Sequence, residues 1–200
     1  MYSKIQKGDI RSMRKVLQLL IIVVVGIAVA LMLISPELVL IFGSPKYREA
    51  VYVIPPVAAS VFFIFIYNIL SMPQFYYEKT QFLMAASMAA AGANVVLNFI
   101  FIRLFGYIAA GYTTLACYML YSVGHYIVSK RILVNEGIQE NLMNPGFLVA
   151  CSVFLIGASI ICNLIFPYRI LRYAILLASA GLVFWKKELL LKTMADIRKK

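Results

Sequence analysis

Two side-chain amides, Asn94 and Asn98, lie one helical turn apart within the strongly apolar residues 92–112. An amide left without a hydrogen bond in apolar surroundings costs about 2 to 7 kcal/mol, so both need a partner. Ala86 and Ala90 continue the same helical face at a spacing of four, which lets another helix approach closely. The amides therefore either bond across a helix–helix interface, the interpretation we favour, or contact a ligand.

A second pattern follows in residues 114–125, where Thr114, Tyr118, Tyr121 and His125 fall on one face at i, i+4, i+7 and i+11. Tyrosine rings stack on apolar ring faces while hydroxyls exchange hydrogen bonds, a combination that suits a sugar. Aromatic anchoring at a membrane boundary and helix packing form the alternative, which we favour. The candidate residues of a substrate cavity are Asn68, Asn94, Asn98, Thr114, Tyr118 and Tyr121.

The sequence shows no motif typical of a catalytic, metal or phosphate-binding site. The sequence has no paired carboxylates, no Ser/His/Asp set and no Gly-rich phosphate loop, and its one histidine is not a metal site. The three cysteines have no CxxC spacing and are interpreted as small packing residues. We therefore expect neither an enzyme nor a bound cofactor.

The elements that carry these residues are predicted to be membrane-spanning helices. Hydrophobic residues make up 63% of the 200 residues and the mean hydropathy is +0.89, too apolar for a soluble globule. A spanning helix needs about 20 apolar residues, and the sequence has six such runs. The predicted spans are residues 16–35, 51–72, 80–102, 107–129, 146–166 and 169–185, so the expected fold is an all-α bundle of six transmembrane helices.

The basic residues predict the orientation of this bundle. Of the 19 Lys and Arg, only Lys46, Arg48, Arg103, Arg169 and Arg172 fall on one side of the predicted spans, and 14 fall on the other. By the positive-inside rule both termini are cytoplasmic. Arg172 lies near enough to the end of its span for its charged group to reach the interface.

Two further features concern the organisation of the chain. The polar loop over residues 130–145 divides the four preceding spans, within residues 1–130, from a terminal pair with a basic cytoplasmic tail, residues 131–200. The basic segments 1–15 and 186–200 also contain apolar residues, and they either lie along the anionic lipid surface or form solvated tails.

In series, these segments resemble the C-terminal part of oligosaccharide flippases of the multidrug/oligosaccharidyl-lipid/polysaccharide exporter superfamily, the polysaccharide biosynthesis C-terminal region. The resemblance covers about residues 2–130. It includes a basic loop after Gly8-Asp9, an outer segment with Phe42, Gly43, Tyr47 and Ala50, a Lys79-Thr80 turn, and a run with Asn94, Asn98, Ile102, Phe105, Gly106, Ala110 and Thr114. Arg103 and Ala109 depart from it, since proline and glycine are usual there.

The resemblance implies a function and an incomplete transporter. It implies the C-terminal portion of an inner-membrane, bacterial-type flippase that moves a polyprenyl-diphosphate-linked oligosaccharide outward for O-antigen, capsule or exopolysaccharide synthesis. The implied partners are this lipid-linked glycan, membrane lipids and the missing N-terminal lobe; no nucleic acid or cofactor is implied. These 200 residues alone are expected not to transport.

Three alternatives remain open at this point. A lipid II flippase and a multidrug exporter belong to the same superfamily, although the buried acidic residues that such exporters use for ion coupling are absent from the predicted spans. A membrane scaffold subunit that transports nothing is the alternative from a different class.

Overall fold

The computed structural model describes residues 10–185; residues 1–9 and 186–200, with most of the two basic terminal segments, lie outside this range. The described part is helical and contains no β-strand, which confirms the predicted all-α class. Its elements are α2 (Ile10–Phe42), the 3₁₀-helix η1 (Pro45–Tyr52), α3 (Ile54–Tyr76), α4 (Gln81–Phe105), α5 (Ala109–Asn135), α6 (Pro145–Ile165) and α7 (Arg169–Trp185).

Four helices are long and apolar enough to cross a membrane: Met13–Phe42 within α2, α3, α4 and α6. The predicted spans 107–129 and 169–185 coincide with α5 and α7, which are not among these four. With 17 residues, α7 is shorter than the other α-helices. α5 carries the Thr, Tyr, Ser and His side chains of the polar stripe, which lower its hydropathy. The chain is therefore a helical bundle with four helices of membrane-spanning character.

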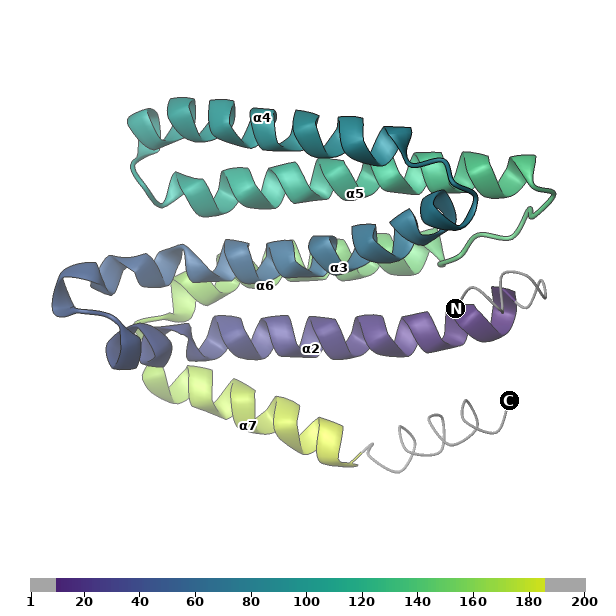
Figure 1. The fold of residues 1–200 in the computed structure, drawn as a ribbon. Helices are drawn as coiled ribbons and strands as arrows, with labels where there is room; N and C mark the ends of the chain where they lie inside the picture. The colour runs from purple at the N-terminus through teal and green to yellow at the C-terminus, as the bar shows by residue number, and fades with distance from the viewer. Residues whose placement is uncertain (1–9, 186–200) are drawn as a thin grey trace.

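The helices lie side by side, with α3 near the centre of the bundle (Figure 1). α3 packs against α2, α5 and α6, whereas α4 packs mainly against α5, and α7 lies beside α2. Phe62 and Leu70 of α3, Met32 of α2 and Leu155 of α6 are almost completely buried. No residue of α4 is buried, so one side of this helix has no protein neighbour in the described part of the chain.

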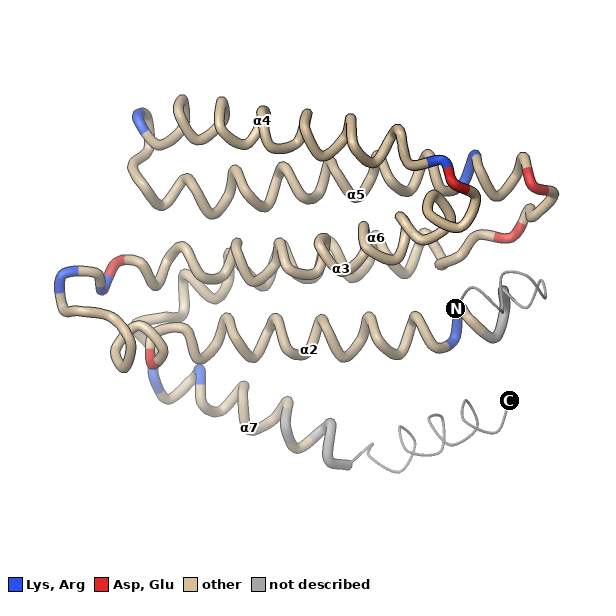
Figure 2. The backbone as a smooth tube through the Cα atoms, viewed as in Figure 1, with Lys and Arg blue, Asp and Glu red and all other residues tan. Residues whose placement is uncertain are grey.

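The positions of the charged residues lie toward the two ends of the bundle, and the middle of the described helices carries none (Figure 2). Large apolar side chains cover the outside; Ile41, Phe105 and Ile170 are all more than two-thirds exposed. A soluble protein avoids an apolar surface this extensive, whereas hydrocarbon tails solvate it without cost. The surface thus agrees with the membrane character of the four helices.

The first helix is longer than the predicted span, because α2 continues past Pro36 to Phe42. Proline has no amide hydrogen to donate to the carbonyl four residues before it, here that of Met32. The Ser35 hydroxyl bonds this carbonyl at 2.8 Å, and the neighbouring carbonyl of Leu33 accepts a 2.8 Å hydrogen bond from Arg172. Side chains therefore satisfy the backbone where the proline interrupts it, and the helix continues.

The turn between α4 and α5 is tight. α4 ends at Phe105 and α5 begins at Ala109. Gly106 has φ 77° and its amide donates to the Ile102 carbonyl at 2.9 Å. This left-handed conformation favours glycine. The turn makes α4 and α5 an antiparallel pair, which brings the amides of one helix beside the hydroxyls of the next.

Candidate functional site

A groove of about 460 Å³ lies between α3, α4 and α5 and contains most of the predicted cavity residues. Asn94 comes from α4, and Thr114, Tyr118 and Tyr121 come from α5. Small residues form the rest of the α4 wall, so the groove stays open beside the amide. The groove lining includes neutral polar groups and aromatic rings, and no charged side chain among the described residues.

The two amides form a short hydrogen-bonded chain at one end of this groove. Asn98 Nδ2 donates to Asn94 Oδ1 at 2.9 Å, and the Thr113 hydroxyl of α5 donates to Asn98 Oδ1 at 2.5 Å. Asn98 does not line the groove itself, because its amide is used in this bond between α4 and α5. Asn98 therefore acts in helix packing, as one of the two interpretations holds, whereas Asn94 faces the groove.

Tyr67 of α3 completes the aromatic wall. Its ring lies nearly parallel to that of Tyr118, with centroids 6.3 Å apart, and edge-on to that of Tyr121 at 4.7 Å. The Tyr121 hydroxyl lies 2.6 Å from the Ser87 hydroxyl of α4, which closes the groove at this level. The wall is therefore a set of three tyrosines fixed by their mutual contacts.

Several groove groups remain available for a ligand. Within residues 10–185 the hydroxyls of Tyr67 and Tyr118 and the Nδ2 of Asn94 have no hydrogen-bond partner. Each can donate, and the hydroxyls can also accept, while the rings offer apolar faces. Such a set suits an uncharged, hydroxyl-rich molecule better than an anion.

Asn68 is the predicted cavity residue that the structure does not bring to the groove. It is exposed on α3, and its Nδ2 donates to the Ile64 carbonyl of its own helix at 2.8 Å. This local bond satisfies the amide without a partner helix.

A buried polar pair lies beside the groove, behind Tyr121. Gln74 of α3 and His125 of α5 are both completely buried, and Gln74 Nε2 lies 2.8 Å from His125 Nδ1. The imidazole contacts the rings of Tyr67, Tyr121 and Phe82. His125, which the sequence placed on the same stripe as the tyrosines, thus supports the groove wall from inside the bundle.

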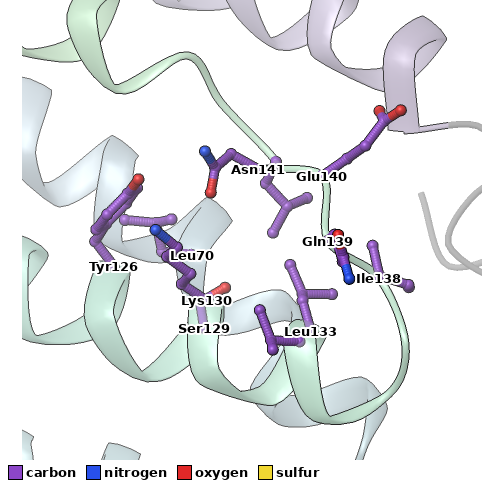
Figure 3. A pocket seen from close by; sticks show the side chains of 11 residues that line it. Leu70, Tyr126, Ser129, Lys130, Leu133, Ile138, Gln139, Glu140 and Asn141 are labelled. Carbon is purple, nitrogen blue, oxygen red and sulfur yellow. The ribbon is translucent and has the colours of Figure 1, made fainter.

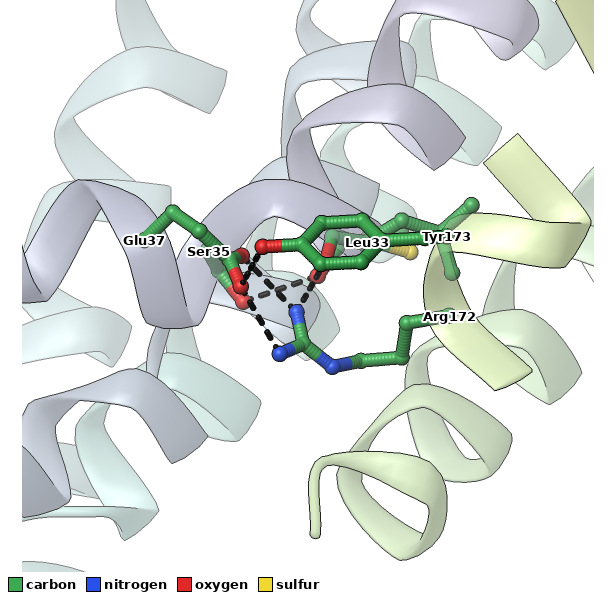
Figure 4. A network of polar contacts seen from close by, with 6 residues as sticks. Leu33, Ser35, Glu37, Arg172 and Tyr173 are labelled. Carbon is green, nitrogen blue, oxygen red and sulfur yellow. Dashed lines mark hydrogen bonds and ion pairs between the residues drawn. The ribbon is translucent and has the colours of Figure 1, made fainter. Parts of the chain in front are cut away.

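A second polar network joins α2 to α7 at the other end of the bundle (Figure 4). Arg172 Nη1 and Nη2 bond the two carboxylate oxygens of Glu37, each at 2.8 Å, and the Tyr173 hydroxyl donates to the same carboxylate. The Arg172 side chain is only 2% exposed. That Arg172 reaches the membrane interface stays a prediction; in the structure its guanidinium is paired with Glu37 and the Leu33 carbonyl near one end of the bundle.

Comparisons with family models, with curated protein sequences and with solved structures found no match to this chain.

Sequence reasoning missed Tyr67, Ser87 and Gln74. Tyr67 lies next to Asn68 in an apolar helix, and no spacing to other polar residues distinguishes a groove residue there from a packing residue. Ser87 lies seven residues before Asn94 and thus on the same face of α4, so this spacing could have identified it. Gln74 follows a proline at the end of α3, and nothing local links it to His125, 51 residues later.

Proposed function

We propose that this chain is the C-terminal part of a membrane flippase that moves a polyprenyl-diphosphate-linked oligosaccharide across the bacterial-type inner membrane. The groove holds part of the glycan, and transport alternates access to it from the two sides. The proposed activity is translocation of a substrate and not catalysis of a reaction. The lipid-linked glycan, the surrounding lipids and an N-terminal lobe of the same transporter are the partners.

One observation carries this proposal: α3, α4 and α5 form a groove with unpaired hydroxyl and amide donors and with aromatic faces. Burying such donors without partners in a membrane protein is unfavourable, so a polar ligand or water must meet them. Sugars combine apolar ring faces with hydroxyl groups, which matches Tyr118 and Asn94. The resemblance of residues 2–130 to the flippase region points to the same class of substrate.

The proposal includes six spans with both termini in the cytoplasm. α5 is joined to α4 by a tight turn at one end of the bundle and leads into α6 from the opposite end (Figure 1). If α4 and α6 cross the membrane, α5 crosses it too, and its polar face is turned to α3 and α4 rather than to lipid. α7 is short, and its salt bridge to α2 keeps it beside the spans. The excess of Lys and Arg at the end with Arg14, Lys79 and Lys130 favours that end as cytoplasmic.

The missing lobe is part of the proposal for two reasons. A diphosphate needs cationic or other strong donors, and the groove has no charged residue among those described, while the buried Arg172 is occupied by Glu37. The free side of α4, next to the groove, also needs a protein neighbour that keeps lipid away from Asn94. A second lobe that faces α4 supplies both the cationic groups and this neighbour.

Complementation tests this function. The longest reading frame that contains this sequence is expressed in a cell that lacks its oligosaccharide flippase, and surface glycan is measured. We expect export to be restored by the full frame and abolished by Tyr118→Ala at equal membrane abundance, with the exposed Ile127→Ala on the same helix as control. No export from the full frame in cells that supply several different glycans contradicts the proposal and favours a scaffold.

A further inference from the structure

Gln74 and His125 form a buried hydrogen bond, and the Leu70 carbonyl determines which of the two residues is the donor. Gln74 Nε2 lies 3.3 Å from the Leu70 carbonyl and 2.8 Å from His125 Nδ1. A carbonyl oxygen only accepts, so the amide nitrogen, and not the amide oxygen, must face Leu70. The same nitrogen then donates its second hydrogen to His125.

This arrangement selects one tautomer of the imidazole. Because Nδ1 accepts from Gln74, it carries no hydrogen, and neutral His125 has its hydrogen on Nε2. The Nε2 group of His125 and the Oε1 of Gln74 are both buried without a hydrogen-bond partner in the described part of the chain. The pair thus has one unused donor, the Nε2–H of His125, and one unused acceptor, the Oε1 of Gln74.

Proton binding to Nδ1 is incompatible with this arrangement. A proton taken from water onto the Nδ1 lone pair gives an N–H that faces the N–H of Gln74, so two donors meet. Rotation of the Gln74 amide by about 180° removes the conflict, because Oε1 then accepts from Nδ1, and the bond to Leu70 is lost. The pair therefore has two alternative hydrogen-bonded states, selected by one proton.

Aromatic rings surround the imidazole. Measured between ring centroids, Tyr67 of α3 lies at 5.8 Å, Phe82 of α4 at 5.4 Å and Tyr121 of α5 at 4.5 Å, in tilted or edge-on contacts. The two tyrosines are the titratable groups in ring contact with His125, and no described residue forms an ion pair with it.

A small cavity lies at the end of α5 (Figure 3) and is lined by Ser129 and Leu70, each one helical turn along its helix from a member of the pair. Its volume of about 10 Å³ is at the lower limit for holding one water molecule. Ser129, one helical turn after His125, lines it and has a buried hydroxyl without a partner. Lys130 and Glu140 are the charged residues of its lining. Arg14 holds the loop over the cavity through hydrogen bonds to the Asn141 carbonyl at 2.6 and 3.2 Å.

We infer that His125 is a proton-binding site, reached through the cavity at Ser129, whose protonation reverses the Gln74 amide behind the tyrosine wall of the groove. Tyr67 and Tyr121 contact both the imidazole and the groove, so the proton acts on the wall that faces the ligand. The inference concerns the chain itself and does not depend on which substrate the groove binds.

A single histidine makes the test direct. The full chain is labelled with ¹⁵N-histidine, purified with a histidine-free tag and reconstituted in lipid nanodiscs, and its two ring nitrogens are followed by solid-state NMR from pH 8 to pH 4.5. We expect one species at pH 8, with hydrogen on Nε2 and none on Nδ1, which converts to the doubly protonated ring on acidification. Hydrogen on Nδ1 at pH 8, or no protonation down to pH 4.5, overturns the inference.

Variants separate the switch from a histidine that is merely buried. Gln74→Glu places an acceptor at Nδ1, so its spectrum at pH 8 should show hydrogen on Nδ1. Ser122→Ala removes an equally buried hydroxyl of α5 that bonds its own helix, and should leave the wild-type tautomer. Ser129→Val removes the hydroxyl and fills the cavity, and should slow exchange of the ring hydrogen at least threefold. An unchanged tautomer in Gln74→Glu, or unchanged exchange in Ser129→Val, contradicts the proposed switch or its entry route.

Discussion

Arg172 of α7 and Glu37 of α2 form a two-pronged salt bridge, with both nitrogen–oxygen distances at 2.8 Å, between residues 135 positions apart. Among the described residues, this pair, the hydrogen bond from Tyr173 to Glu37 and the hydrogen bond from Arg172 to the Leu33 carbonyl are the polar side-chain links between the last helix and the first. In the described part of the chain α7 packs mainly along α2 and less against α6. The position of α7 therefore depends on this pair.

Breaking the pair should destabilise the protein. Arg172→Ala leaves the Glu37 carboxylate partly buried without its cation, and we expect a loss of about 3 kcal/mol in unfolding free energy, measured by denaturation in detergent. Arg172→Lys should restore less than half, because an ammonium cannot bond both oxygens. Arg169→Ala, at an exposed residue of the same helix, is the control. Equal stability of Arg172→Ala and the control would show that α7 is held by other contacts.

The turn glycine offers a sharper stability test. Gly106→Ala forces a left-handed conformation on a residue with a Cβ, and should cost about 1 to 2 kcal/mol in unfolding free energy. Gly92→Ala is the matched control: both positions have open space around the added Cβ, but Gly92 lies inside α4 with helical φ. The control should be neutral or stabilising. Equal effects of the two substitutions would contradict the role of the conformation.

The amides should separate into a structural and a ligand-facing residue. Asn98→Leu removes the hydrogen bond to Thr113 and should lower stability by about 0.6 to 2 kcal/mol. Asn94→Ala should lower glycan export by the full transporter with little change in thermal stability. Stability and export are measured for both variants in parallel. A fall in export that follows the loss of stability in each variant would show that both amides serve packing.

Cysteine labelling tests the orientation. Single cysteines at Ser3, Ser44 and Lys199 are introduced after replacement of the native Cys117, Cys151 and Cys162 by alanine, and a membrane-impermeant reagent is applied to intact cells. Because Lys and Arg are concentrated on the side of the two termini, we expect labelling at Ser44 and none at Ser3 or Lys199 until the cells are permeabilised. External labelling at either terminal position would contradict the six-span orientation.

The helices and part of the groove were predictable from local sequence, but the polar pairs were not. Long apolar runs determine where helices form in a membrane, and a spacing of four placed Asn94 and Asn98 on one face of α4. The length of α2 was underestimated because a proline such as Pro36 normally ends a helix. One of the donors that bond the backbone carbonyls near Pro36 is Arg172, which lies 139 residues after Leu33 in the sequence. Gln74 and His125 likewise meet only after α3 and α5 pack.

Photocrosslinking from the groove tests the central claim most directly. A photoreactive benzoylphenylalanine replaces Tyr118, inside the groove, or Ile127, on an exposed part of the same helix, in the full reading frame expressed in glycan-producing cells. After illumination, the adducts are identified by mass spectrometry. The account predicts an adduct with the lipid-linked glycan at position 118 and only membrane lipid at position 127. Ordinary lipid alone at both positions would contradict a glycan-binding groove.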